Sequence, residues 1–181
     1  LKDPIPLPPA EALCKVAGQT CYMSFGPKRT FNEGAQKYFD NLISSGHGSV
    51  LEHANFSFLI YGISRSITHE LVRHRAGMGY SQLSQRYVSG KFVRFVERPE
   101  YQENEFLHKM FERRIDFLSE EYESVADYLL FLQTKGDPFL SAEVKTDKRK
   151  KVQQAARSAL PNETEAPIVA TGNIRSWRHV I

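Results

Sequence analysis

Residues 73–87 carry side chains that together could bind a phosphorylated, ring-bearing ligand. Arg73, His74 and Arg75 stand in a row, and the run Tyr80-Ser81-Gln82-Leu83-Ser84-Gln85-Arg86-Tyr87 follows after a linker with two glycines. Guanidinium groups are planar, charged donors that suit phosphate, while hydroxyls and amides suit the polar edge of a ring. Three cationic or titratable groups in succession are costly to bring near a core without such a ligand. This segment is therefore the first place to look for function.

Two other chemistries fit the spacing poorly. His69 and His74 lie five residues apart, which is about 140° around a helix, so they cannot share a zinc ion as the histidines of a His-Glu-x-x-His motif do. Ser84 has no Gly-x-Ser-x-Gly elbow and no evident base beside it, which favours ligand hydrogen bonding over nucleophilic attack. We therefore expect no metal site, and a hydrogen-bonding role for Ser84.

The segment 65–75 is predicted to be a helix with Ser64 as its N-cap. Arg65, His69 and Arg73 are spaced at i, i+4 and i+8 and would form one stripe. The opposite face would contact the core through three apolar residues: Ile63, Ile67 and Leu71. An ordinary amphipathic helix with a solvated basic face remains the alternative, although the pattern lacks the carboxylates that such a face often carries.

Histidines also flank an expected strand at residues 55–61. His47 lies within Gly46–Ser49, a tight turn whose backbone N–H groups could hold an anion. Glu52 and His53 come just before the strand. Structural roles are favoured over catalytic ones for such histidines, so this signal is weak when taken alone.

Two cationic segments lie near the end of the chain. Residues 173–179 combine an amide, two guanidiniums, the only tryptophan and a histidine, which suits stacking with phosphate recognition and equally suits the start of a structural helix. Lys148–Lys151 is a charge run on an expected helix. A solvated face is the favoured interpretation of that run, and an RNA-binding patch is the alternative.

The composition fits one globular domain. The chain has 181 residues, of which 41% are hydrophobic, enough for a real core. A net charge of +3 does not demand a nucleic-acid partner but permits a local basic site. Cys14 and Cys21 are expected to be free thiols in a reducing cytosol, so a cytoplasmic location is predicted. No apolar run approaches the roughly 20 residues of a membrane span.

Periodicity and breaker residues predict more helix than strand, in an α/β or α+β arrangement. Glycines are expected to end the first two helices, at Gly18 and Gly46, and Asp147 is expected to open the fifth. The predicted helices are 10–17, 31–45, 65–75, 104–133 and 147–159, with a further one beginning at 173. The predicted strands are 55–61 and 168–171, and residues 80–96 are expected to be extended with a turn at Gly90.

Taken together, the sequence resembles the flavin-dependent thymidylate synthase family from Cys21 to Ile181. The resemblance is carried by ordered motifs: Gly46–His53, Ile63–Arg75, Tyr80–Tyr87, Ala156–Asn162 and Thr171–His179. It implies an α/β (α+β) fold with a mixed or antiparallel sheet covered by several helices. It also implies reductive methylation of dUMP to dTMP, with methylenetetrahydrofolate and NADPH as co-substrates and FAD as cofactor.

The resemblance further implies three sets of site residues. FAD would be bound by Ser49, His53, Arg73, His74, Arg75, Gln82, Asn173 and His179. The dUMP substrate would be bound by Arg65, Glu70, Gln82, Ser84, Gln85, Arg86 and Arg157. The residues with catalytic roles would be His53, Arg73, Ser84 and Arg86. Because a flavin carries the hydride chemistry, no cysteine nucleophile is needed. Family members are homotetramers with shared active sites, so Arg86 would serve a neighbouring chain, and no nucleic-acid or membrane partner is expected.

Two departures from the family pattern stand out. Eight residues separate Arg75 from Ser84, where the family signature has seven, and the extra residue falls in or near Ala76–Gly79, whose glycines can absorb a bulge. Residues 1–181 are expected to form a single domain of this family that lacks its first strand and its C-terminal segment. The latter is a helix with a further arginine and acidic residues.

Overall fold

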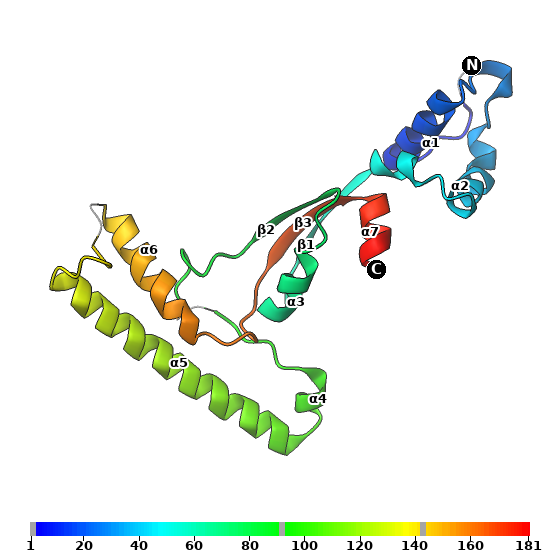
Figure 1. Cartoon of the computed structure of the whole chain (residues 1–181). Coiled ribbons are helices and arrows are strands. Elements are labelled where there is room, and N and C mark those ends of the chain that lie inside the picture. The colour runs from blue at the N-terminus through cyan, green and yellow to red at the C-terminus, as the bar shows by residue number, and fades with distance from the viewer. Residues whose placement is uncertain (1–2, 91–92, 142–143) are drawn as a thin grey trace. The chain divides into compact units, whose positions relative to one another are not determined.

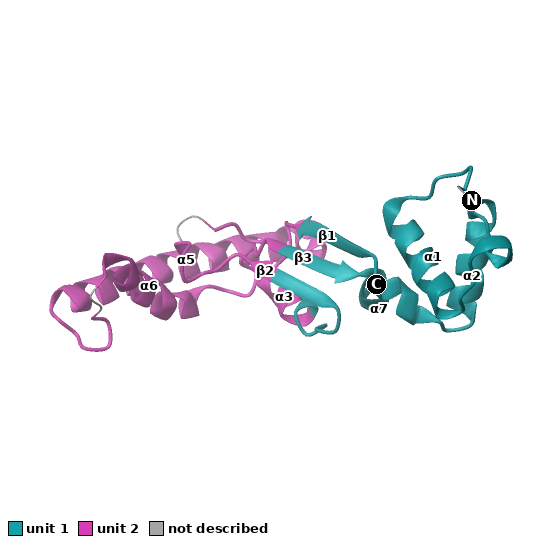
Figure 2. Ribbon diagram, turned by 90° about the horizontal axis from the view of Figure 1, so that it is seen from above, with its two compact units in different colours: residues 1–59, 71–80, 169–181 teal, residues 60–70, 81–168 magenta. Residues whose placement is uncertain are grey.

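The structure is a computed structural model that describes residues 3–90, 93–141 and 144–181. Its chain divides into two compact units, coloured separately in Figure 2. Unit 1 comprises residues 1–59, 71–80 and 169–181, and unit 2 comprises residues 60–70 and 81–168. The single-domain organisation expected from the sequence stays a prediction.

A three-stranded antiparallel sheet, in the order β1-β3-β2, contributes most of its residues to unit 1 (Figure 1). The strands are β1 Asn55–Ile60, β2 Met78–Gln82 and β3 Ile168–Asn173. The central strand β3 alternates between buried Ile168 and Ala170 and exposed Val169, as a strand with one covered face should. The predicted fold class is confirmed, and the expected strands at 55–61 and 168–171 are both present.

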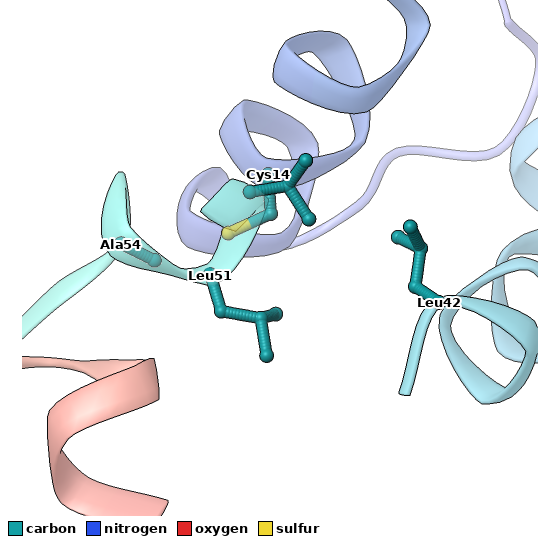
Figure 3. Packing of buried hydrophobic residues seen from close by; sticks show 5 residues of the cluster. Cys14, Leu42, Leu51 and Ala54 are labelled. Atoms are coloured by element: carbon teal, nitrogen blue, oxygen red, sulfur yellow. The ribbon is translucent and has the colours of Figure 1, made fainter. Parts of the chain in front are cut away.

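Unit 1 contains α1 Pro9–Cys21, α2 Ala35–Ser44 and α7 Ile174–Val180, together with the 3₁₀ turns η1 Gly26–Lys28, η2 Asn32–Gly34 and η3 Gly48–Glu52. Its core is a cluster of small and branched side chains, four of which are labelled in Figure 3: Cys14, Leu42, Leu51 and Ala54. The cluster joins α1, α2 and η3. Apolar burial of this kind contributes about 25 cal/mol per Å² and is what holds η3 in place.

The glycine expected to stop the first helix lies inside it instead. Helix α1 continues to Cys21, and Gly18 is buried where an added Cβ would lie only 2.0 Å from the Tyr38 hydroxyl of α2. The glycine therefore permits close helix packing rather than ending a helix. Gly46 does act as the predicted terminator of α2, with φ +70°, and the backbone N–H groups of Gly46 and His47 donate to the carbonyls of Ile43 and Leu42.

Unit 2 is mainly helical. Its elements are α3 Arg65–Leu71, whose last residue belongs to unit 1, α4 Pro99–Gln102, α5 Glu105–Thr134, α6 Lys145–Ala156 and the 3₁₀ turn η5 Arg157–Ala159. Helix α5 matches its prediction within one residue at each end, because the Asn104 side chain accepts hydrogen bonds from two first-turn N–H groups at 3.1 Å. Helix α6 begins two residues before Asp147, which is therefore not its cap, and α4 was not predicted.

The segment 65–75 is only partly helical. Helix α3 ends at Leu71, so Arg73, His74 and Arg75 lie in the following loop rather than in the predicted helix, and Arg73 is not part of a helical stripe. The predicted core face is also wrong, because Ile67 is 55% exposed whereas Thr68 is fully buried. The start of α3 is fixed instead by tertiary backbone hydrogen bonds, including Arg65 N–H to Thr164 O at 2.9 Å.

The extended run predicted over 80–96 is largely absent. Strand β2 ends at Gln82, and the backbone N–H groups of Tyr87 and Val88 turn back to the Ser84 carbonyl. Phe95 re-enters β-pairing through an isolated bridge to Thr164, and residues 91–92 lie outside the described part of the chain. Among the described residues, no helix is both long and apolar enough to cross a membrane.

Candidate functional site

The two compact units divide the expected site residues between them. Unit 1 holds all but one of those expected to bind the flavin: Ser49, His53, Arg73, His74, Arg75, Asn173 and His179. Unit 2 holds the residues expected to bind the nucleotide: Arg65, Glu70, Gln82, Ser84, Gln85, Arg86 and Arg157. Gln82, expected at both ligands, lies in unit 2.

In unit 1, the loop after α3 meets helix α7. The rings of His74 and His179 contact each other edge to face, with centroids 5.6 Å apart and an interplanar angle of 72°. The Tyr80 hydroxyl donates to the His74 carbonyl at 2.9 Å, which holds the loop against β2. Burial raises the pKa of Tyr80, so its hydroxyl stays protonated and can donate. Two of the expected flavin residues, 105 positions apart in the sequence, are thus in contact.

Gly77 sits where no other residue would fit. Its φ is +70°, and an added Cβ would lie 2.4 Å from both the Asn173 side-chain amide and the Ser176 hydroxyl. The Ser176 hydroxyl donates to the Ala76 carbonyl at 2.7 Å, while Asn173 caps α7 by accepting from the Ser176 N–H at 2.8 Å. The linker Ala76–Gly79, which contains the extra residue, therefore packs against the N-terminus of α7.

A cavity of ≈ 390 Å³ opens beside this junction. It is lined by Glu52, Ala76, Gly77, Asn173, Arg175, Ser176 and His179. A half-exposed ion pair, Arg175 to Glu52 at 2.5 Å, crosses from α7 to η3 and forms part of the wall. A second cavity in unit 1, of ≈ 370 Å³, includes Ser49 and also Arg175. His53, Arg73 and Arg75 are exposed.

The turn at Gly46–Ser49 does not have the free N–H groups that the sequence suggested. The N–H groups of Gly46, His47 and Gly48 donate to the carbonyls of Ile43, Leu42 and Gly46 respectively. These bonds complete the end of α2, so they are not available to an anion. The interpretation of this turn as an anion site is wrong.

In unit 2, two expected nucleotide residues form a pair of like charges. Arg65 opens α3 and Arg157 opens η5. Burial, together with the positive charge of Arg157, lowers the pKa of Arg65. The Nη1 atom of Arg65 is buried and has no hydrogen-bond partner among the described residues. Buried guanidinium groups normally have carboxylate partners, so this Nη1 atom is an unsatisfied hydrogen-bond donor.

The carboxylates of the neighbouring loop are already occupied. Glu165 is buried and accepts two hydrogen bonds from Arg94, at 2.6 and 3.1 Å, and one from the Gly62 N–H at 2.7 Å. Glu163 pairs with Arg114 at 2.5 Å. These pairs fix the loop that receives the start of α3. The positive charge at Arg65 and Arg157 is not neutralised by them.

The strand end at residues 82–85 presents polar groups in fixed positions. The Gln82 amide donates to the Thr68 hydroxyl at 2.7 Å, and that hydroxyl donates to the Arg65 carbonyl at 2.9 Å. Ser84 accepts from the Arg86 N–H at 3.3 Å, as in a serine turn, and Gln85 is buried. Glu70 is exposed near the end of α3.

Arg86 lines a basic cavity that sequence reasoning missed. The cavity measures ≈ 440 Å³ and is lined by Arg86, Tyr87, Lys145, Thr146, Arg149, Lys150 and Gln153. Lys150 lies over the Tyr87 ring at 4.9 Å and pairs with Asp147 at 3.1 Å. The run Lys148–Lys151 is therefore not simply a solvated face. The i, i+4 spacing of Lys145 and Arg149 could have placed both on one side of α6. No feature of the local sequence shows that Tyr87 lines the same cavity.

The described residues contain no cluster of three or more histidine, cysteine, aspartate or glutamate side chains able to hold a metal ion. Both cysteines are free, Cys14 in the core and Cys21 exposed. Burial raises the pKa of the Cys14 thiol, which keeps it protonated. The groups around these three cavities include guanidinium, amide, hydroxyl and imidazole side chains. Such groups suit an α/β protein that binds anionic, ring-bearing ligands.

Comparison with known proteins identifies the family. The sequence profile described as thymidylate synthase complementing protein matches residues 6–181, so the chain belongs to this family. The flavin-dependent thymidylate synthase of Mycobacterium tuberculosis strain H37Rv is 44% identical over 173 residues, covering 94% of this chain and 65% of the relative. The enzyme of the same name from Mycobacterium avium strain 104 gives the same values. The chain thus spans just under two thirds of the length of these relatives.

These comparisons confirm the resemblance seen in the sequence. They do not favour the alternative of an RNA-binding module.

Proposed function

We propose that this chain catalyses the reductive methylation of dUMP to dTMP, using methylenetetrahydrofolate, NADPH and FAD. Family membership and the names of the mycobacterial relatives support this reaction. The structural observation that carries the proposal is the Arg65–Arg157 pair with its buried, unpartnered Nη1 atom. A nucleotide phosphate would neutralise both guanidiniums and accept the missing hydrogen bond.

On the nucleotide side, unit 2 supplies the binding groups. Arg65 and Arg157 would hold the phosphate, and Arg86, in the basic cavity beside α6, would add charge. Gln82, Ser84 and Gln85 would face the uracil and ribose, where amides and hydroxyls can both donate and accept. Ser84 would act as a hydrogen-bond donor to the substrate rather than as a nucleophile. Glu70 completes the proposed set.

On the flavin side, the residues of unit 1 fit a planar, polar cofactor. The cavity beside Gly77 is lined by an amide, a hydroxyl and an imidazole, and the glycine lets the amide and the hydroxyl lie close to the backbone. His74, Asn173 and His179 would contact FAD there, with Ser49, His53, Arg73 and Arg75 completing the site. When bound, FAD supplies the hydride-transfer chemistry. Among the four residues with proposed catalytic roles, His53 and Arg73 would orient the cofactor, and Ser84 and Arg86 would orient dUMP.

A thiol nucleophile is not required for this reaction. Cys14 is 1% exposed, and burial raises its pKa, so it is neither accessible nor ionised. We further propose a homotetramer whose active sites are shared between subunits, with Arg86 serving a neighbouring chain. A cytoplasmic location is proposed from the two free thiols.

Tritium release from dUMP labelled at the ring position that is methylated tests the reaction directly. We expect release that requires FAD, NADPH and methylenetetrahydrofolate together, and a flavin absorption band at about 450 nm in the purified protein. Release in the absence of FAD would contradict the proposal. Tight dUMP binding without any release would identify a homologue that binds nucleotide without turnover.

A further inference from the structure

Residues 163–166 form the middle segment of a small backbone arrangement in unit 2. On one side, two hydrogen bonds of 2.9 Å join this middle segment to residues 63–65. On the other side, hydrogen bonds of 2.7 and 2.8 Å join it to residues 94–96. An isolated antiparallel bridge lies within each of the two pairings. The backbone of Arg65 is therefore part of an ordered set of three chain segments rather than of a free loop.

The side chain of Glu165 joins the middle segment to both neighbours a second time. One carboxylate oxygen, Oε1, accepts from the Gly62 N–H at 2.7 Å and from Nη2 of Arg94 at 3.1 Å, and Oε2 accepts from Nε of Arg94 at 2.6 Å. The Glu165 side chain is 7% exposed, whereas that of Arg94 is 76% exposed. A buried carboxylate that is bonded on both sides constrains the segments that it joins, because leaving such groups without partners costs free energy.

These contacts hold the backbone on both sides of Arg65. The Glu165 carboxylate binds the N–H of Gly62, three residues before Arg65. Three residues after it, the Thr68 hydroxyl donates to the Arg65 carbonyl at 2.9 Å. The Arg65 side chain needs such support, because its Nη1 atom is buried without a hydrogen-bond partner among the described residues. A backbone that moved freely would let this nitrogen relax towards water.

We propose that Glu165 is a positioning residue for the nucleotide phosphate, which acts through residues 62–65 and contacts no ligand itself. The inference rests on the proposed nucleotide site at Arg65 and Arg157. Arg157 opens η5, and the chain runs on from there into the middle segment, so the segment that Glu165 anchors also follows directly from the second arginine. A site that is held in place before the phosphate arrives loses less conformational freedom on binding.

The ion pair between Glu165 and Arg94 suits this role. A lone carboxylate near a phosphate site would repel the ligand. The guanidinium of Arg94 offsets that charge through two hydrogen bonds. Glu165 can therefore hold the backbone without weakening the attraction between the arginines of the site and the phosphate.

Calorimetric titration of the full chain with dUMP tests the role of Glu165. Glu165→Leu removes the acceptors for both partners, and we expect the dissociation constant for dUMP to rise at least about 30-fold because the backbone of Arg65 is no longer held. Glu165→Gln keeps an oxygen for the Gly62 N–H, so the rise should be only about threefold. In turnover assays the loss should appear in KM for dUMP with kcat nearly unchanged, because binding rather than chemistry is affected.

Glu163→Gln is the matched control. Glu163 lies in the same middle segment, but its ion pair with Arg114, at 2.5 Å, joins that segment to α5 rather than to residues 62–65. We expect Glu163→Gln and Glu165→Gln to lower the unfolding temperature by similar amounts, about 2–6 °C. Only Glu165→Gln should change the affinity for dUMP by more than about twofold. A residue that acts on stability alone would not separate these two measurements.

Two results would overturn the proposal: wild-type dUMP affinity in a folded Glu165→Leu protein, or an equal loss of affinity in Glu163→Gln and Glu165→Gln. Circular dichroism checks folding, and the comparison of the two Glu→Gln variants decides the question if Glu165→Leu does not fold. A wild-type chain that binds no dUMP would overturn the proposed nucleotide site and this inference with it. Tight binding by the wild type that no Glu165 variant weakens would overturn this inference alone.

Discussion

The proposed ligand-binding residues of unit 1 and unit 2 differ in whether their polar groups already have partners. In unit 1, the polar groups around Gly77 are bonded to one another: Asn173 caps α7, Ser176 bonds to the Ala76 carbonyl, and Arg175 pairs with Glu52. In unit 2, burial and the positive charge of Arg157 both lower the pKa of Arg65, and a buried side-chain nitrogen of Arg65 has no hydrogen-bond partner among the described residues.

The difference separates two ways of building a binding site. The unit 1 site depends on shape, because its hydrogen bonds are already made and the absence of a Cβ at Gly77 lets the Asn173 and Ser176 side chains approach the backbone closely. The unit 2 site depends on charge, because its arginines are costly until an anion arrives. Substitutions in unit 1 should therefore damage folding and binding together, whereas substitutions in unit 2 should separate them.

The largest effect is expected for Gly77→Ala. The new Cβ would lie 2.4 Å from Asn173 and Ser176, and the residue would keep an unfavourable φ of +70°. We expect a loss of about 2–4 kcal/mol in the free energy of unfolding and loss of FAD retention. Thermal unfolding and the flavin absorbance of the purified protein measure the two effects.

Gly46→Ala is the matched control for that substitution. Gly46 lies in the same unit with the same φ of +70°, but an added Cβ would meet nothing within 4 Å. Only the conformational cost of about 1 kcal/mol should remain, with FAD retained. Equal damage from the two substitutions would show that backbone strain, not the shape of the cavity, governs unit 1.

The next largest effect is expected for Arg65→Met, which should affect binding without harming the fold. Removing a partly buried, unpaired charge should leave stability unchanged or raise it slightly. The affinity for dUMP should fall about 100-fold, because one of the two guanidiniums at the phosphate is lost. Calorimetric titration with dUMP and thermal unfolding should be run on the same samples.

Arg114→Met makes the opposite change within unit 2. It breaks the ion pair with Glu163, whose carboxylate is partly buried. Stability should fall while dUMP affinity changes little. If Arg65→Met destabilised the protein as Arg114→Met does, the arginine would be structural and the phosphate assignment would be lost.

The sequence predicted best those elements whose ends are fixed by local groups. Helix α5 is set by its Asn104 cap and a long apolar stripe, and α7 by its Asn173 cap. The end of α3 was missed because it depends on contacts made elsewhere in the chain, such as the Tyr80 hydroxyl bonding to the His74 carbonyl. Gly18 was misinterpreted for the same reason: only the position of Tyr38 shows why it is there.

The candidate site shows the same limit. Residue types in Arg73–Tyr87 indicated anion binding, but Arg65 and Arg157 lie 92 positions apart. Only the family resemblance connected them before the structure placed both in unit 2. The basic cavity at Arg86 was missed because periodicity shows which side of α6 is charged, not that Tyr87 lies against it.

Thr68→Val is expected to have a moderate effect and tests how far unit 2 is held in place before its ligand arrives. Thr68 is fully buried, and its hydroxyl accepts from Gln82 and donates to the Arg65 carbonyl. Losing both bonds should cost about 1–2 kcal/mol and weaken dUMP binding a few-fold, since Gln82 would no longer be oriented. In unit 1, Thr171→Val removes an exposed bond to Ser57 and should cost less than about 0.5 kcal/mol.

The smallest effect concerns a charge in unit 2 that depends on pH. The His108 ring bonds to Glu97 at 2.8 Å, and this hydrogen bond, supported by the charge of Glu112, raises the pKa of His108. A raised pKa means that the stabilisation is fully present below the ordinary histidine pKa of about 6.5 and is lost as pH rises through the folded value. At about pH 5.5, the unfolding temperature of His108→Gln should therefore lie below that of the wild type, by no more than about 2 °C because the pair is exposed. At about pH 8.5 the two unfolding temperatures should be equal. A difference that does not change with pH would mean that His108 contributes through packing on α5 instead of through charge.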